Sequence, residues 1–290
     1  MQGCSVCNIC PTPIRLEQAT EITRVPCNVR RFKDELFTVW RCPVCLSLHS
    51  KEAVDVSYYY EHYPFREHTL DLWARIGYAN YLKRLQRVGL ARNHLLMDFG
   101  CGPGLFVTFL HEHGYQAVGY DKHVPQFADP SALNKSYDFI VAQDIIEHVD
   151  DPKELLMELK ARLRPGGILC IGTPNAEGIS LSDPESYALS LHQPYHRHIL
   201  SERALRSLAH DQNLEVMALY HRYYYDTLYP SVNYRFLQTY VKKAGNVLDV
   251  AFEPPKIALV LTSPILWVWA LLGYFYPPRS EMTIIFRRQL

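Results

Sequence analysis

The 290-residue sequence lacks an excess of charge of either sign. Lysine and arginine together number 30, and aspartate and glutamate also number 30. General nucleic-acid binders carry a basic excess, so this balance predicts no nucleic-acid partner. Charged residues make up only 21% of the chain, and apolar residues make up 48%. This composition excludes a disordered protein, and a chain of this length has enough apolar residues for a sizeable core.

The sequence also lacks a recognisable secretory signal, because no basic region followed by an apolar run occurs in residues 1–13. We therefore expect a cytoplasmic protein whose eight cysteines are thiols or metal ligands, not disulfides. Six of the eight lie in the first 45 residues. No internal repeat and no low-complexity tract is present.

Short apolar runs alternate with amphipathic segments between residues 93 and 222. Strands are predicted near 95–99, 117–120, 137–142, 168–172 and 214–220, with helices at 105–113, 151–163 and 201–212. An earlier helix is predicted over 69–88, with Thr69 as its N-cap. Alternating strands and helices predict an α/β fold with a doubly wound, mostly parallel sheet covered on both faces.

A glycine-rich turn follows the first of these strands. It has the sequence Asp98-Phe99-Gly100-Cys101-Gly102-Pro103-Gly104, and the next strand ends in Asp121, 21 residues beyond Gly100. Glycines let the backbone approach a ligand closely, and an acid at this distance is placed to accept hydrogen bonds from ribose hydroxyls. The combination predicts a nucleoside-containing cofactor.

The spacing of the turn excludes two common nucleotide sites. No Walker lysine follows it, and a dinucleotide fingerprint would need a glycine where Leu105 stands, which argues against a dehydrogenase. With its third glycine at 104, the turn resembles motif I of class I S-adenosylmethionine (SAM)-dependent methyltransferases. Two further segments, Tyr137–Val149 and Leu163–Gly167, resemble the ubiquinone-type O-methyltransferase branch of that family.

This resemblance implies a fold, a cofactor and a set of site residues. The fold would be a Rossmann-like domain with a seven-stranded sheet. Asp98, Gly100, Gly102 and Gly104 would lie near the methionine part of SAM, Asp121 would hold the ribose, and Gln143, Asp144 and Ile145 would line the site. The sequence departs from the family where an acid usually faces the adenine amine, since Asp129 is a poor candidate for that role.

Methyl transfer to a hydroxyl or carbon also needs a general base. The candidates are Glu147, His148, His192, His196 and His198, of which Glu147, His148, His196 and His198 are the predicted catalytic set. Imidazole titrates near neutral pH and therefore suits this task, although any one of these histidines can equally be a surface or hydrogen-bonded core residue. Which ring reaches a substrate proton is a question of geometry.

The clustered cysteines predict a structural zinc ribbon over residues 1–50. Cys42-Pro43-Val44-Cys45 forms one ligand pair, and Cys4, Cys7 and Cys10 offer another. The residue after the second cysteine often needs a positive φ, which Asn8 can adopt and Pro11 cannot, so we favour Cys4, Cys7, Cys42 and Cys45 and keep Cys10 as the alternative to Cys4. A zinc ribbon before this core resembles a subgroup that includes sugar C-methyltransferases.

Residues 51–92 hold a tyrosine-rich stretch, 58–65, before the helix. In the family that the chain resembles, the segment before the core closes over the cofactor, and tyrosine rings can shield a sulfonium by cation–π contact. Packing between ribbon and core is an equal alternative. The methyltransferase domain is then expected over 93–290.

An apolar helical insertion is expected at 223–280. Residues 257–276 carry no charge and contain Trp267, Trp269, Tyr274 and Tyr276. A simple crossing of a bilayer is disfavoured, because 282–286 is expected to pair antiparallel with 214–220 and both strands must lie on one side of a membrane. Pro264 also interrupts a helix. We expect an in-plane or re-entrant membrane contact, with a dimer interface or an active-site lid as the alternative.

These features together predict a SAM-dependent methyltransferase with structural zinc. It would act on a lipid or isoprenoid-like acceptor at the inner face of a membrane. The alternatives are a nucleotide-sugar or glycan acceptor, with the insertion as contact in a homodimer, and a SAM-binding scaffold without activity.

Overall fold

The computed structural model describes residues 4–64 and 69–289. Phe65, at the end of the tyrosine-rich stretch, lies outside these residues. The central sheet has the strand order β11-β12-β9-β8-β6-β7. Its strands are β6 (Leu95–Phe99), β7 (Gln116–Tyr120), β8 (Tyr137–Gln143), β9 (Leu163–Pro174), β11 (Leu214–Tyr220) and β12 (Glu281–Arg288).

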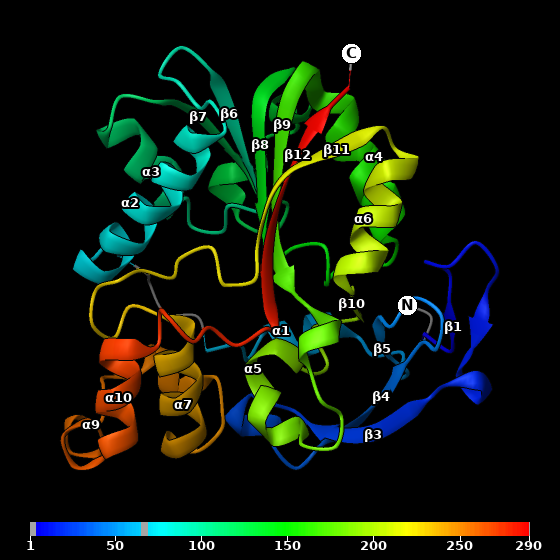
Figure 1. Ribbon diagram of the computed structural model, residues 1–290, viewed down its shortest axis with the longest axis vertical. Helices are drawn as coiled ribbons and strands as arrows, with labels where there is room; N and C mark the ends of the chain where they lie inside the picture. The colour runs from blue at the N-terminus through cyan, green and yellow to red at the C-terminus, as the bar shows by residue number, and fades with distance from the viewer. Residues whose placement is uncertain (1–3, 65–68, 290) are drawn as a thin grey trace.

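The predicted α/β fold is confirmed, because β7, β6, β8 and β9 run parallel while β12 pairs antiparallel with both β9 and β11. The expected pairing of 282–286 with 214–220 is part of this arrangement. Figure 1 shows β12, the last segment of the chain, inserted between two strands that precede it.

The sheet has six strands in the described residues, so the prediction of seven is corrected. The missing strand would follow β7, where the chain instead forms two short 3-10 helices, η3 (Pro125–Phe127) and η4 (Pro130–Asn134). Proline lacks the N–H that a ladder requires, and the connection to β8 is too short for both a helix and a strand. β7 is therefore an edge strand.

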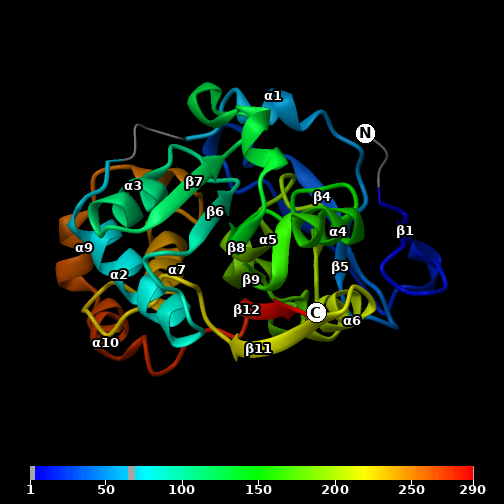
Figure 2. The same cartoon turned by 90° about the horizontal axis from the view of Figure 1, so that it is seen from above.

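Helices cover both faces of the sheet (Figure 2). On one face, α2 (Leu72–Arg87) and α3 (Leu105–Glu112) pack through residues such as Tyr81, Leu85 and Phe109. On the other, α4 (Pro152–Arg162) and α6 (Glu202–Asp211) bury a leucine-rich stripe.

The N-cap of α2 is Asp71, whose side chain accepts a hydrogen bond from the Ala74 N–H. The predicted cap at Thr69 is therefore wrong by two residues.

The N-terminal residues form two small sheets. β1 (Val6–Cys7) pairs with β2 (Ile14–Arg15), and β3 (Glu21–Pro26), β4 (Leu36–Arg41) and β5 (Leu48–Ser50) form the second. That second sheet takes its fourth strand, β10 (His198–Ile199), from the core. Short helices complete this region: η1 (Leu16–Gln18), η2 (Arg30–Phe32), α1 (Val56–Tyr60), η5 (Ala176–Gly178), η6 (Pro184–Tyr187) and α5 (Ala188–Leu191).

The segment between β11 and β12 forms four helices. They are α7 (Tyr234–Ala244), α8 (Asp249–Phe252), α9 (Ile257–Thr262) and α10 (Pro264–Leu272). Pro264 is the first residue of α10, so the uncharged run is broken into two short helices. Within residues 4–64 and 69–289, none of the helices combines the length and the hydropathy that a bilayer crossing requires.

Candidate functional site

The glycine-rich turn lies at the carboxyl end of β6. Gly100, Gly102 and Gly104 all have positive φ, at 76°, 52° and 75°. The Gly100 N–H donates to the carbonyl of Tyr120 at 2.7 Å, which ties the turn to the end of β7. The left-handed backbone makes side chains costly here, and a Cβ on Gly102 would point into open space. The turn therefore leaves room for a ligand beside its backbone.

Asp121 joins this turn directly. Its Oδ2 accepts from the Gly102 N–H at 3.0 Å, and its Oδ1 accepts from the His123 N–H at 2.8 Å. Each carboxylate oxygen has a second lone pair, so the side chain can still accept from two hydroxyls. The turn and the acid predicted to grip a ribose are thus in contact.

Asp98, one residue before the end of β6, is a buried carboxyl. Burial, and secondly the charge of Asp121, raises its pKa to about 7. No basic side chain of the described residues forms an ion pair with it. A cationic ligand group at this point would compensate the carboxylate, which fits the methionine end of SAM.

The residues after β8 have separate roles. Ile145 packs on the turn, since a Cβ on Gly100 would lie 2.1 Å from its Cδ1. Asp144 has a positive φ of 55° and accepts from the Tyr223 hydroxyl at 2.8 Å, while burial raises its pKa to about 6. Gln143 instead donates its amide N–H to the Tyr81 hydroxyl, so its side chain faces α2.

Two aromatic residues at this edge of the sheet were not predicted from the sequence. The ring of Phe127 fills the space beside Gly104 and Gly119, and Tyr223 binds Asp144 across 79 residues of chain. Phe127 lies in a loop for which the sequence predicts no secondary structure, so no local pattern pointed to it.

Asp129 acts as a helix cap. Its exposed side chain accepts hydrogen bonds from the backbone N–H and the hydroxyl of Ser131.

A cluster of histidines lies next to these residues, and we call it the histidine cluster: His148, His192 and His196 with Glu147. The rings of His148 and His196 have centroids 4.7 Å apart, and those of His192 and His196 are 4.9 Å apart. Ligand-type atoms of Glu147, His148 and His196 lie within 4.8 Å of one another. The structure thus brings together three of the four predicted catalytic residues.

The hydrogen-bond partners determine which nitrogen of each ring is a base. Nδ1 of His148 lies 3.1 Å from the carbonyl of Tyr195, and Nδ1 of His196 lies 2.8 Å from that of Ser190. A carbonyl only accepts, so both Nδ1 atoms carry hydrogen and both Nε2 atoms hold a lone pair. Burial lowers the pKa of His148 to about 4 and that of His196 well below its usual value, so both rings are neutral.

Glu147 is fully buried in the middle of the histidine cluster. Its Oε2 accepts from the Thr173 hydroxyl at 3.1 Å, and its Oε1 lies 3.9 Å from Nε2 of His196. Burial, reinforced by the nearby Asp144, raises its pKa well above the usual range. This environment favours the neutral form of the carboxyl, and the role of Glu147 as a base stays a prediction.

Tyrosines of the stretch 58–64 cover the histidine cluster. The hydroxyl of Tyr60 lies 3.4 Å from Nδ1 of His148, and its ring lies 6.4 Å from that of His123, which follows Asp121. The hydroxyl of Tyr63 donates to Nε2 of His192 at 3.1 Å. Because Nδ1 of His192 also binds Asn28, this ring has both nitrogens occupied.

His198 lies away from the histidine cluster, so its predicted place there is corrected. It belongs to β10, and its Nδ1 is 3.0 Å from Nδ1 of His49 on β5. His196 lies in the preceding turn, where its N–H donates to the carbonyl of His192. The change from turn to strand sends the two side chains in different directions.

Four cysteine sulfurs form a separate buried group. Cys7 and Cys45 are 3.6 Å apart, Cys10 and Cys42 are 3.7 Å apart, and Cys7 and Cys10 are 3.9 Å apart. Tetrahedral zinc with Zn–S bonds of about 2.3 Å places sulfurs about 3.8 Å apart. The group therefore fits a zinc ion held by four thiolates.

This group contains Cys10 and not Cys4, so the favoured ligand set is corrected. Pairing of Cys7 with Ile14 folds the intervening turn back and brings Cys10 to Cys7, whereas the N–H of Cys4 donates to Ser50. Leu46, after Cys45, does have the positive φ expected there, at 62°. Cys10 is nevertheless part of the group although Pro11 follows it, so a positive φ is not required after the second cysteine of this pair. None of the eight cysteines forms a disulfide.

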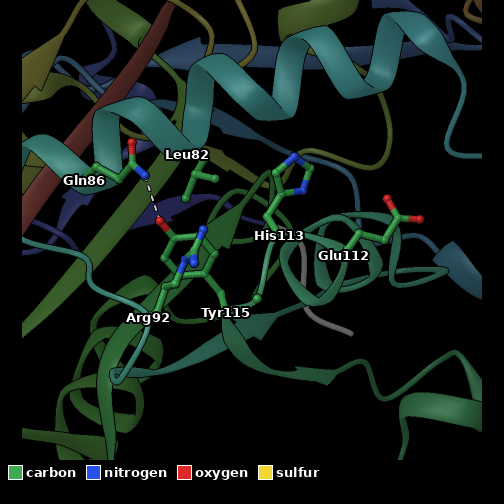
Figure 3. A pocket seen from close by; sticks show the side chains of 7 residues that line it. Leu82, Gln86, Arg92, Glu112, His113 and Tyr115 are labelled. Carbon is green, nitrogen blue, oxygen red and sulfur yellow. Dashed lines mark hydrogen bonds between the residues drawn. The ribbon is translucent and has the colours of Figure 1, made fainter.

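A surface cavity of about 480 Å³ lies elsewhere, between α2 and the turn before β7 (Figure 3). Gln86 donates to the Tyr115 hydroxyl at 2.7 Å across it. Gly114 and Tyr115 stand at the amino end of β7, opposite the glycine-rich turn. This cavity is therefore separate from the candidate site.

Comparison with known proteins agrees with this geometry. The model of a family described as "Methyltransferase domain" matches residues 68–219, more than half of the chain. The chain belongs to this methyltransferase family, and its core is that of the class I SAM-dependent enzymes.

Its curated relatives include two that are named ubiquinone biosynthesis O-methyltransferase. The protein of Coxiella burnetii is 30% identical over 111 residues, covering 31% of this chain and 47% of the relative. That of Rickettsia bellii is 26% identical over 100 residues, covering 28% and 42%. The chain thus spans less than half the length of these relatives.

Solved structures similar to this chain include SAM-dependent methyltransferases of Archaeoglobus fulgidus and Mesorhizobium loti. The first has a TM-score of 0.44 at 14% identity, covering 73% of this chain and 94% of the other. The second has a TM-score of 0.41 at 16% identity, covering 72% and 98%.

Proposed function

We propose that the protein transfers a methyl group from SAM to a lipophilic acceptor at a membrane surface. The observation that carries the proposal is the 3.0 Å hydrogen bond from the Gly102 N–H to Asp121, which assembles the turn and the acid into one cradle. SAM supplies an electrophilic methyl group on a sulfonium. Asp98 compensates the ligand's positive charge, and Asp121 accepts from its ribose hydroxyls.

The protein's tasks in such a transfer are alignment, exclusion of water and removal of a proton. Tyr60 and Tyr63 cover the histidine cluster and contact it by hydrogen bonds. His148 is the group with an unprotonated Nε2 that is only partly buried, so it is the base in this proposal. Titration with SAM by isothermal calorimetry tests the cradle, and an absence of binding at millimolar SAM would refute it.

The proposed acceptor class rests on the surface of the helical segment 223–280. Large apolar side chains are exposed along α9, α10 and the residues after them: Ile257, Leu261, Ile265, Trp267, Val268, Leu271, Leu272, Phe275 and Tyr276. Exposed apolar surface of this extent, rich in aromatic residues, is typical of a site of membrane contact. The names of the curated relatives, which refer to ubiquinone biosynthesis, support an isoprenoid-like acceptor.

A basic groove adjoins this apolar surface. A cavity of about 720 Å³ between α2 and residues 220–229 is lined by Arg75, Lys83, Arg84, Arg87 and Arg222, together with Leu228, Tyr229 and Tyr274. Leu228 and Tyr229 are exposed, at 64% and 60%. Arg84 is buried and Arg75 is paired with Glu112, whereas Lys83 and Arg87 are exposed. Exposed cationic side chains beside apolar ones suit anionic lipid headgroups, so we propose peripheral binding at the cytoplasmic face of a membrane.

We expect Trp267→Glu combined with Leu271→Glu to lower membrane binding at least tenfold. Both side chains are about half exposed on α10, and burying each in a bilayer is worth ~1.5 kcal/mol or more. Flotation with vesicles of phosphatidylcholine and phosphatidylserine measures the effect. Met157→Glu, on α4 and 51% exposed, is the matched control. Equal flotation of all three proteins would contradict membrane binding and favour a homodimer contact.

We also propose that Cys7, Cys10, Cys42 and Cys45 hold a structural zinc ion. Cys42→Ser is expected to remove one zinc per chain and to open residues 4–50 to proteolysis, because a segment this small has little core of its own. Elemental analysis and limited proteolysis are the measurements. Cys27→Ser is the control, since Cys27 is equally buried but outside the group. Unchanged zinc in Cys42→Ser would refute the assignment.

A further inference from the structure

A second cluster of metal-ligating side chains lies beside the four cysteines. It joins Cys4, His49 on β5 and His198 on β10, and all three are buried, with exposures of 8%, 1% and 7%. One potential ligand atom from each lies within 4.8 Å of the others. We propose that these three residues form a second metal site, which takes a divalent cation of the zinc class.

The distances fit such an ion. Nδ1 of His49 and Nδ1 of His198 are 3.0 Å apart, and the sulfur of Cys4 is 3.7 Å from Nδ1 of His198. Tetrahedral zinc with Zn–N bonds of about 2.05 Å and a Zn–S bond of about 2.3 Å separates two nitrogens by about 3.3 Å and a nitrogen from a sulfur by about 3.5 Å. Shifts of a few tenths of an ångström would complete the site.

The orientation of His198 is the one that a metal ligand needs. Its Nε2 lies 3.1 Å from the carbonyl of Asp150, so that nitrogen carries the hydrogen. The lone pair is then on Nδ1, which faces both His49 and Cys4. A histidine that binds metal through one nitrogen usually donates the other N–H to a carbonyl or carboxylate, which is the arrangement here.

Three protein ligands leave a fourth position for water. One thiolate and two neutral imidazoles form a donor set that zinc accepts. The site would connect Cys4 and His49, both in the N-terminal region, to a strand that begins two residues after His196. It would therefore anchor the turn that carries His192 and His196, whether or not the protein transfers methyl groups.

Metal content tests the proposal on the full-length protein. Elemental analysis after purification without chelators is expected to give two zinc ions per chain. Cys4→Ser and His198→Gln are each expected to give one, whereas His210→Gln, a 91% exposed control on α6, keeps two. One zinc in the wild type, or two in both Cys4→Ser and His198→Gln, would overturn the proposal.

A spectroscopic measurement covers the case in which both variants fail to fold. Wild-type protein is treated with a mild chelator until one zinc remains, and Co²⁺ is then added. A tetrahedral Co²⁺ spectrum with one thiolate charge-transfer band is expected at one equivalent. Absence of Co²⁺ binding, or a spectrum with four thiolates and no second species, would overturn the assignment to Cys4, His49 and His198.

Discussion

His148→Gln is expected to lower kcat for methyl transfer by about 100-fold or more, with little change in KM for SAM. General-base catalysis contributes roughly 10²–10⁴-fold to a rate. Glutamine keeps a polar side chain of similar reach but has no basic nitrogen. The assay measures the transfer of labelled methyl from SAM into a lipid extract.

The pH profile tests the same role independently. Burial lowers the pKa of His148 to about 4, so the base stays unprotonated as the pH falls through 6.5. The acidic limb of kcat/KM is therefore expected between pH 4 and 5, and His148→Gln should remove it. His210→Gln serves as the control, because that histidine is exposed on α6. A loss of less than threefold in His148→Gln would assign the base elsewhere.

Asp121→Ala is expected to weaken SAM binding about 100-fold. Hydrogen bonds to a charged group are each worth about 1.5–3 kcal/mol, and two ribose hydroxyls would lose their acceptor. The substitution also removes the acceptor of the Gly102 N–H, which holds the turn in place. Isothermal calorimetry gives the Kd, and a melting curve reports whether the fold is intact.

Two further variants sharpen this result. Asp121→Asn keeps one acceptor oxygen without the charge, and an intermediate loss is expected. Asp129→Ala should bind SAM normally, since Asp129 caps η4 and its carboxylate is satisfied by Ser131. Equal affinities of Asp121→Ala and the wild type for SAM would show that Asp121 does not bind the ribose, which would refute the proposed cradle.

The cofactor half of the site was predictable because it is built from neighbours in sequence. The glycines from Gly100 to Gly104 occupy one turn, and Asp121 directly follows the adjacent strand, so strand order alone brings them together. The substrate half was only partly predictable. His148, His192 and His196 were recognised by residue type, but their grouping depends on a turn packed under α1, which has no local pattern.

Two of the corrected predictions, the zinc ligand set and the place of His198, have a common origin in contacts between distant segments. Cys10 replaced Cys4 because β1 pairs with β2, and His198 left the histidine cluster because β10 joins the N-terminal sheet. The seventh strand is missing for a local reason, since Pro125 and Pro130 occupy the short connection where it would form.

The amino-acid sequence by itself determined the α/β core, the glycine-rich turn with its acid, and the presence of a thiolate site. Each of these depends on periodicity or spacing within a few tens of residues, where backbone geometry leaves little choice. Tertiary structure alone decided which sulfurs meet and in which direction the pKa values of the buried histidines and carboxyls are shifted. Those properties depend on burial and on hydrogen-bond partners, and packing brings both from remote parts of the chain.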